Sequence, residues 1–128
     1  MAKRVLLVDD DADLLAALRV VLEAEGYEVA TATNGAEGWQ AARESPPDLA
    51  VVDAMIDTFS EGVHLACRLR SDADLKAMPI IMVTAVNDEL PYRLDGRGGP
   101  GGPCADRFME RPVDPSELLS AMAELLRS

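Results

Sequence analysis

The sequence lacks long apolar runs and is poor in positive charge. No stretch approaches the roughly 20 apolar residues of a membrane-spanning helix, and the N-terminal MAKRVLLVDDD turns acidic too early for a signal peptide. We therefore expect a cytoplasmic protein that does not insert into membranes. Twenty-three acidic residues against twelve basic ones leave a formal charge of -11, which repels phosphate backbones and anionic lipids. Direct nucleic-acid binding is not expected.

Cysteine and histidine are also scarce. Cys67 and Cys104 show no metal-ligand spacing, and in a reducing compartment we expect them to be free thiols without a role rather than a disulfide. His64 is the only histidine, and it stands in a helical pattern among apolar residues. We interpret it as a partly exposed helix residue rather than a metal ligand.

Short apolar runs alternate with segments whose apolar residues recur at helical spacing. The length of 128 residues is usual for one domain, which we take to span residues 1–128. Strands are predicted at 4–8, 28–31, 49–52, 79–83 and around 108–109. Helices are predicted after residue 11, ending at Gly26, at 35–43, at about 61–70, and from Pro115 onward.

Five nearly continuous apolar strands separated by helices predict a parallel sheet that is covered on both faces. This is a doubly wound α/β fold. Ligands of such folds bind beyond the carboxyl ends of the strands, near the point where the strand order reverses. The predicted strands place Asp9, Asp10, Asp53 and Thr84 at that edge.

Three carboxylates at one edge repel one another unless a cation lies among them. An incomplete set of oxygen ligands suits Mg²⁺, which keeps several waters and binds phosphate oxygens. An aspartate can also act as a nucleophile and accept phosphate as an aspartyl phosphate. The alternative is that Asp9, Asp10 and Asp11 cap the following helix; the presence of Asp53 and Thr84 at two further strand ends favours the first interpretation.

Four stretches together resemble the receiver domain of two-component response regulators: KRVLLVDDDADLL, DLAVVDAM, PIIMVTA and ADRFMERPVDPSELL. The resemblance covers nearly the whole chain. It implies a flavodoxin-like α/β fold with a five-stranded parallel sheet in the order 2-1-3-4-5. It also implies a phosphoprotein that receives its phosphoryl group from a sensor histidine kinase or a phosphotransfer protein.

The same resemblance assigns roles to individual residues. Asp53 would be the phosphoacceptor. Mg²⁺ would be held by Asp10, Asp53 and the backbone carbonyl of Met55, with Asp9 acting through water. Thr84 would hydrogen-bond the phosphoryl group, Phe108 would report phosphorylation by its burial, and Arg111-Pro112 would carry the family's cis peptide bond.

The chain departs from the family at three places. Arg111 stands where the family has lysine, and its planar fork fits a site differently from a compact ammonium. Asp57 adds a carboxylate near the metal side, although an exposed loop acid is the simpler interpretation. The glycine and proline content of residues 96–103 excludes a regular fourth helix, so we expect a loop there. GRGGPG within it neither follows a strand nor opens a helix, which argues against a dinucleotide site.

Two apolar residues would flank the water that attacks the phosphoryl group. These are Met55 and Val86, two positions beyond Asp53 and Thr84. Neither side chain can orient a water as an amide or carboxylate does. We therefore expect a long-lived phosphoaspartate.

These observations favour a stand-alone receiver that switches the binding of a downstream protein. We expect it to catalyse only its own phosphorylation and dephosphorylation. One alternative is a phosphorylation-independent pseudo-receiver that acts as a protein interaction module, which Arg111 and the altered helix-four region favour. Another is a phosphohydrolase, which the apolar Met55 two residues after Asp53 opposes. The sequence identifies neither the kinase nor the target, and it leaves a monomer and a homodimer both open.

Overall fold

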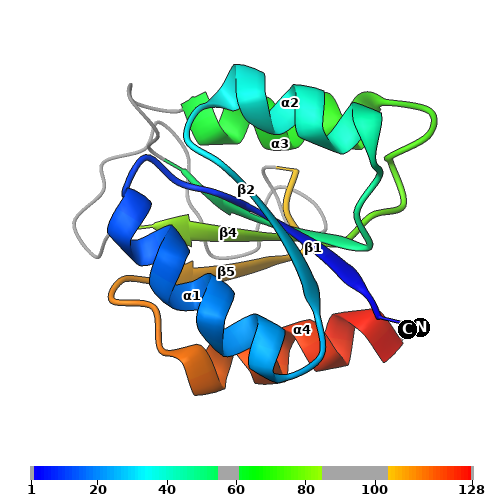
Figure 1. Ribbon diagram of the computed structural model, residues 1–128. Coiled ribbons are helices and arrows are strands. Elements are labelled where there is room, and N and C mark those ends of the chain that lie inside the picture. The colour runs from blue at the N-terminus through cyan, green and yellow to red at the C-terminus, as the bar shows by residue number, and fades with distance from the viewer. Residues whose placement is uncertain (1, 55–60, 85–103, 128) are drawn as a thin grey trace.

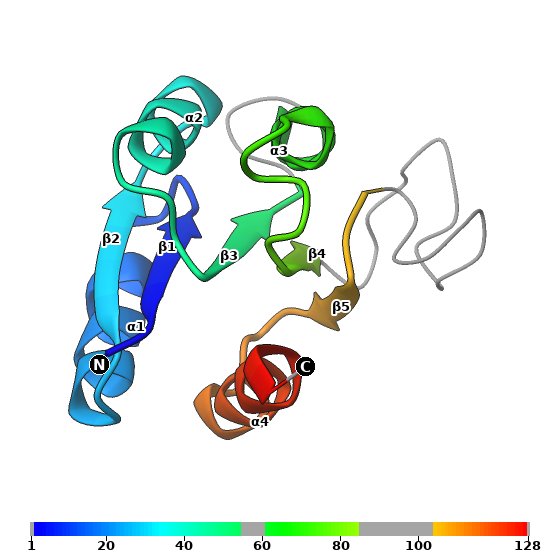
Figure 2. The same ribbon diagram turned by 90° about the vertical axis from the view of Figure 1, so that its right-hand side faces the viewer.

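The computed structural model describes residues 2–54, 61–84 and 104–127. Its centre is a five-stranded parallel sheet in the order β2-β1-β3-β4-β5 (Figures 1 and 2), so the predicted doubly wound α/β fold is confirmed. The strands are β1 (Arg4–Val8), β2 (Glu28–Ala32), β3 (Leu49–Asp53), β4 (Ile80–Thr84) and β5 (Arg107–Glu110). The helices are α1 (Ala12–Ala24), α2 (Gly35–Glu44), α3 (Glu61–Ser71) and α4 (Pro115–Arg127).

The helices form one layer on each face of the sheet. In Figures 1 and 2, α2 and α3 lie on one side of the strands and α1 and α4 on the other. Alternate strand residues point into the two resulting cores: Leu6 packs with α2 and α3, and Leu7 packs with α1 and α4. Because both faces are covered, every residue of β3 and β4 is buried.

Local signals in the sequence account for the helix ends. The Asp11 side chain accepts hydrogen bonds from the backbone N–H groups of Asp13 and Leu14, both at 3.1 Å, and so caps α1. Gly26 follows that helix with a φ of 93°, a left-handed conformation that glycine adopts without a steric penalty. The predicted boundaries are correct to within a few residues, and Asp53 proves to be the last residue of β3 rather than the residue after it.

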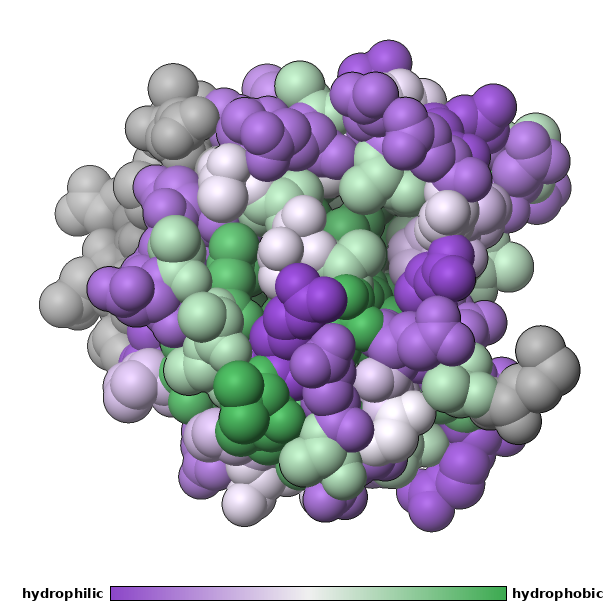
Figure 3. Space-filling view, viewed as in Figure 1, coloured by the Kyte–Doolittle hydropathy of each residue, from purple (hydrophilic) through white to green (hydrophobic). Residues whose placement is uncertain are grey.

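The surface is mainly polar. On the face shown in Figure 3, hydrophilic side chains cover the α2 layer, and apolar side chains show mostly lower down, over the sheet and α1. Among the helices that the structure describes, none has the length and hydropathy needed to cross a bilayer.

Trp39 joins the two helices of one layer. This half-buried side chain of α2 packs against the core. The guanidinium carbon of Arg68, on α3, lies 3.9 Å from the centre of the indole ring, and that of Arg43 lies 5.9 Å from it. These are cation–π contacts, and the closer one connects α2 to α3.

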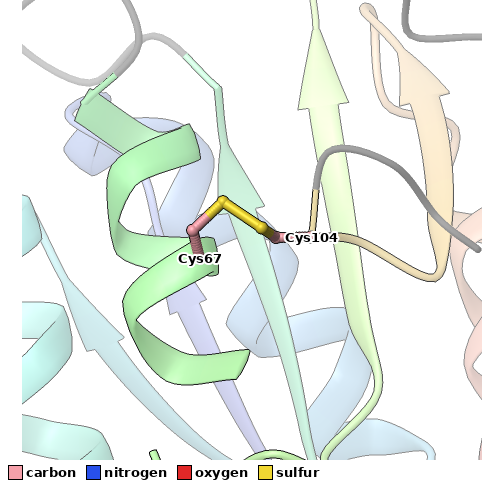
Figure 4. The surroundings of a disulfide bond; sticks show 2 residues. All are labelled: Cys67 and Cys104. Atoms are coloured by element: carbon pink, nitrogen blue, oxygen red, sulfur yellow. A yellow bond between two sulfur atoms is a disulfide. The ribbon is translucent and has the colours of Figure 1, made fainter. Parts of the chain in front are cut away.

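Cys67 and Cys104 form a disulfide (Figure 4), so the prediction of two free thiols is wrong. Cys67 lies on α3 and Cys104 lies just before β5, with a sequence separation of 37 residues. Their Cα atoms are 5.0 Å apart, a separation that a disulfide spans without moving the backbone. The sequence did not reveal the pairing because the two cysteines meet only when the sheet brings β5 beside β4, under α3.

Gly62 is the point of closest approach between α3 and the sheet. A Cβ atom at this position would lie 1.6 Å from the backbone oxygen of Asp53. The Gly62 N–H instead donates to the Ala54 carbonyl at 3.1 Å. The first turn of α3 therefore rests directly on the backbone at the end of β3, and only glycine fits there.

We predict that Gly62→Ala will destabilise the protein by about 1–3 kcal/mol, because the new methyl group collides with backbone atoms that cannot rotate away. Urea unfolding monitored by circular dichroism measures the change. Gly35→Ala is the matched control, since its Cβ would meet only the end of the Glu61 side chain. Equal stability of the two variants would contradict the close packing described for Gly62.

Candidate functional site

The site lies at the carboxyl edge of the sheet, where three neighbouring strands end on polar residues. Asp9 follows β1, Asp53 ends β3 and Thr84 ends β4. Asp9, Asp53 and Thr84 are only 6%, 4% and 6% exposed, and they are the buried polar and charged residues of the described chain. Burial of two carboxylates side by side costs free energy unless other groups compensate it.

The three consecutive aspartates just before α1 make different contacts. Asp11 caps the helix, as the capping interpretation holds. Its backbone N–H also donates to Asp9 Oδ1 at 2.9 Å, which fixes the orientation of that carboxylate. Asp9 and Asp10 instead join Asp53: one carboxylate oxygen from each of the three lies within 4.8 Å of the others.

This trio is the one group of three or more potential metal-ligating side chains among the described residues, and His64 is not part of it. All of its donors are carboxylate oxygens, and one of the three residues, Asp10, is exposed to solvent. Hard cations that keep part of their water shell, such as Mg²⁺, suit this donor set. The residues therefore fit a divalent cation.

Arg111 supplies positive charge to the cluster from the far end of the chain. Its Nη2 atom donates to Asp9 Oδ2 at 2.9 Å and also to Asp53 Oδ2. The Arg111 backbone N–H donates to the Thr84 carbonyl at 2.7 Å, which extends the β4–β5 ladder by one bond and holds Arg111 at this edge. One guanidinium nitrogen thus bridges the two buried carboxylates.

The ionisation of these groups follows from their surroundings. Burial raises the pKa of Asp9 above its ordinary value, although the Asp11 N–H and the Arg111 charge both oppose the shift. Burial alone would lower the pKa of Arg111, but the carboxylates of Asp53 and Asp9 outweigh it and raise that pKa further. Arg111 is therefore permanently charged, and ionised Asp9 carries a free-energy cost that a bound cation would relieve.

Comparison with known proteins identifies this arrangement. Residues 5–123 match the family model of the response regulator receiver domain. The chain belongs to the response regulator receiver domain family. Receiver domains are signalling domains of two-component systems.

Individual relatives agree with this assignment. The receiver is 35% identical over 127 residues to the DNA-binding response regulator MtrA of Mycobacterium tuberculosis H37Rv, with 99% of this chain and 52% of the relative covered. It is 33% identical to the alkaline phosphatase synthesis transcriptional regulatory protein PhoP of Bacillus subtilis 168, with 99% and 50% covered. The chain therefore spans about half the length of these curated relatives.

Solved structures show the same fold. A CheY-like response regulator receiver domain protein of Methanospirillum hungatei JF-1 superposes with a TM-score of 0.81 at 32% identity, with 99% of this chain and 95% of the other covered. The chemotaxis response regulator CheY4 of Vibrio cholerae superposes with a TM-score of 0.81 at 24% identity, with 98% and 99% covered.

The other residues singled out in the receiver sequence divide into two groups. Phe108 lies in β5 opposite Met82 of β4, half-buried against the core on the α2–α3 side. The Arg111–Pro112 peptide bond is cis, the isomer that the resemblance implied. Several other positions lie outside the described residues: Met55, Asp57, Val86 and the 96–103 stretch. The metal-binding and lifetime-tuning roles expected of them stay predictions.

Two backbone contacts of the site escaped the sequence analysis. The backbone N–H of Asp11 orients Asp9, and Gly62 allows α3 to rest on the backbone of Asp53. The only sequence signal for the Asp11–Asp9 hydrogen bond is weak: a carboxylate two residues before a helix cap. The only signal for the Gly62 contact is an isolated glycine at the start of a helical pattern.

We predict that Asp9→Asn will raise the urea midpoint at pH 7 in metal-free buffer. The folded-state pKa of Asp9 is raised, so the stability present in acid, where Asp9 is protonated, is lost as the pH rises through that folded pKa. Asparagine cannot ionise and avoids this loss. The difference in urea midpoint between variant and parent should disappear as the pH falls below 3.8, the ordinary pKa of an aspartate side chain.

Asp13→Asn, at an exposed position of α1, is the control and should show no such pH-dependent gain. A lower midpoint for Asp9→Asn at pH 7 would mean that the Arg111 ion pair outweighs the burial of the Asp9 carboxylate.

Proposed function

We propose that this receiver accepts a phosphoryl group on Asp53 from a phosphohistidine of a sensor kinase or phosphotransfer protein, with Mg²⁺ as cofactor. The convergence of Asp9, Asp10, Asp53, Thr84 and Arg111 at one edge of the sheet supports it. An Asp53 carboxylate oxygen attacks phosphorus, the N–P bond breaks, and the imidazole leaves and takes up a proton.

Each residue of the site has a role in this step. Asp9, Asp10 and Asp53 would hold Mg²⁺, which neutralises charge on the phosphoryl oxygens. Thr84 ends the adjacent strand, where its hydroxyl can donate to a phosphoryl oxygen on Asp53. Arg111 already contacts the Asp53 carboxylate, so its guanidinium is positioned to stabilise the negative charge that arrives there.

Phosphorylation would then change the β5 side of the domain. A phosphoryl group adds anionic oxygens beside Asp53 and draws Arg111 away from Asp9. Arg111 is bonded through its backbone to Thr84 and follows β5, which carries Phe108. A partner that binds one arrangement of β5 and α4 more tightly than the other would read the change. We place this switch in the cytoplasm, and the acidic charge of the domain makes the partner a protein rather than DNA.

One observation favours a second function. Arg111 already bridges Asp9 and Asp53, so the carboxylate cluster has a counter-charge without Mg²⁺. A receiver of this kind could keep one conformation and bind its partner without phosphorylation. In that case Mg²⁺ and a phosphodonor would leave the protein unmodified.

We predict that incubation with acetyl phosphate and Mg²⁺ will add about 80 Da, one phosphoryl group, to the intact mass of the parent protein. Asp53→Asn should gain no mass, because an amide is not a nucleophile for this step. Asp13→Asn, which leaves the site intact, should gain as much as the parent. If all three proteins stay unmodified, the pseudo-receiver function replaces the proposed one.

We further predict that Arg111→Lys will accelerate phosphorylation by acetyl phosphate about tenfold. Lysine ends one bond earlier than arginine, so its ammonium cannot keep both carboxylates. Loss of one charge-assisted hydrogen bond of about 1.5 kcal/mol in the resting state corresponds to that factor. Initial rates of the mass increase measure the effect, and isothermal titration should show tighter Mg²⁺ binding. A slower variant would show that the guanidinium fork suits the transition state better than an ammonium does.

We also expect the phosphoaspartate to persist for minutes or longer, on the basis of the apolar Met55 and Val86 at the positions that flank the attacking water. The decay of the phosphorylated mass after removal of acetyl phosphate measures this lifetime. Met55→Glu, which introduces a side chain able to orient water, should shorten it. Decay of the parent within seconds would contradict the assignment of these two positions.

A further inference from the structure

The disulfide joins α3 to the chain just before β5. Figure 4 shows the bond running from the side of the helix to Cys104. Cys104 lies three residues before the start of β5, the strand that contains Phe108 and directly precedes Arg111. Cys67, Cys104 and Phe108 pack against the same apolar cluster. The covalent bond therefore acts on the part of the fold that we expect to move on phosphorylation.

A second attachment holds the same region without the disulfide. Arg70, one helical turn beyond Cys67, forms an ion pair with Asp106. The Asp106 carboxylate also accepts from the Ile80 N–H at 2.8 Å, and the Asp106 N–H donates to the Ile80 carbonyl at 2.8 Å. These contacts tie Asp106 to the start of β4. Opening of the disulfide would therefore release Cys104 while β5 keeps its place in the sheet.

Cys104 has an unusual backbone conformation. Its φ is 67°, and it is the one non-glycine residue with a positive φ in the described chain. Residues other than glycine adopt this left-handed region at a cost, and they keep it only when the surrounding structure holds them there. The bond to Cys67 is such a restraint. Reduction would allow Cys104 to relax, so the bond's state changes the local backbone.

Both cysteines are half-buried rather than enclosed. From this partial exposure of both residues we infer that small thiols reach the sulfur atoms. Disulfides that are accessible in this way exchange with the surrounding thiol pool, whereas deeply buried ones are protected. In the cytoplasm, where we place this receiver, low-molecular-weight thiols keep accessible cysteines reduced until conditions become oxidising.

We propose that Cys67 and Cys104 are a reversible redox modification site that restrains the start of β5. Closure consumes the two thiols and one low-molecular-weight disulfide: the protein S–S bond forms, the small S–S bond breaks, and two small thiols leave with the protons. Opening is the reverse exchange. The oxidised pair holds Cys104 on α3 and opposes the shift of β5 and Phe108. This effect on β5 and Phe108 rests on the phosphoacceptor function proposed above, whereas the redox site itself does not.

The first experiment is a redox titration of the whole folded chain in buffers with defined ratios of reduced and oxidised glutathione, quenched by an alkylating reagent. Intact mass counts the alkylated thiols. We expect the oxidised fraction to follow the buffer and to reverse. A pair that stays reduced in every buffer would overturn the proposal. So would a pair that resists excess thiol in the folded state, which would make the disulfide a structural crosslink only.

Amide hydrogen exchange provides the second readout and does not require phosphorylation. Reduction should increase exchange about fivefold or more at Cys104 and Ala105, which precede the Asp106 attachment, and leave β1 unchanged. Cys67→Ser should match the reduced parent in either buffer. Cys104→Gly removes the sulfur, but glycine adopts the left-handed φ without a steric cost. This variant therefore separates the effect of losing the crosslink from the effect of the backbone leaving its left-handed conformation. Unchanged exchange at Cys104 and Ala105 on reduction would contradict the restraint.

The third experiment measures phosphorylation of Asp53 by acetyl phosphate in the oxidised and the reduced protein. We expect the reduced form to be phosphorylated about fivefold faster or more, the scale of a typical coupling between two sites. Cys67→Ser should keep the fast rate in oxidising buffer. Equal rates in both forms, with Asp53 phosphorylated in each, would overturn the coupling. If neither form is phosphorylated, the phosphoacceptor function fails, and the redox site is decided by the titration and the exchange data.

Discussion

The bridge that Arg111 forms between Asp9 and Asp53 unites the structure around the site. It joins residues 102 positions apart in the sequence, and it connects the ends of β1, β3 and β5 through one guanidinium nitrogen. Two buried carboxylates at this edge would destabilise the fold without such a charge. The bridge gives the carboxylate cluster a counter-charge from within the chain. Any group that binds to Asp53 has to compete with this ion pair or use it.

The backbone around Asp53 has little freedom. α3 rests on it at Gly62, and the Ala54 N–H donates to the Val83 carbonyl at 2.8 Å. Asp53 is thus fixed by neighbouring strands and by a helix, while Arg111 reaches it on a long side chain from just beyond β5, the edge strand of the sheet. For the phosphoacceptor function proposed above, this combination suits a switch: the Asp53 carboxylate keeps its position while the counter-charge of Arg111 can move.

The strand patterns were sufficient to predict a parallel sheet and the residues at its edge, and the resemblance to the receiver family implied the strand order. Each strand is a short apolar run that stops at a polar residue, so Asp9, Asp53 and Thr84 are marked by the ends of local patterns. Asp11 shows the limit of that reading: it caps α1, whereas Asp9 and Asp10 join Asp53. Hydrogen-bond partners are decided by geometry that the sequence does not show. The Cys67–Cys104 pairing, the Arg111 bridge and the Gly62 contact depend on segments that meet only after folding. Their residue types carry no local pattern that would predict them.

Trp39 gives the domain an intrinsic optical probe. It is the single tryptophan of the chain, and its ring lies against Arg68, the residue that follows Cys67 on α3. Indole emission depends on nearby charge and on exposure to water, so a small displacement of α3 relative to α2 changes its intensity or wavelength. The fluorophore therefore observes the helix that holds the disulfide, in unlabelled protein and in real time.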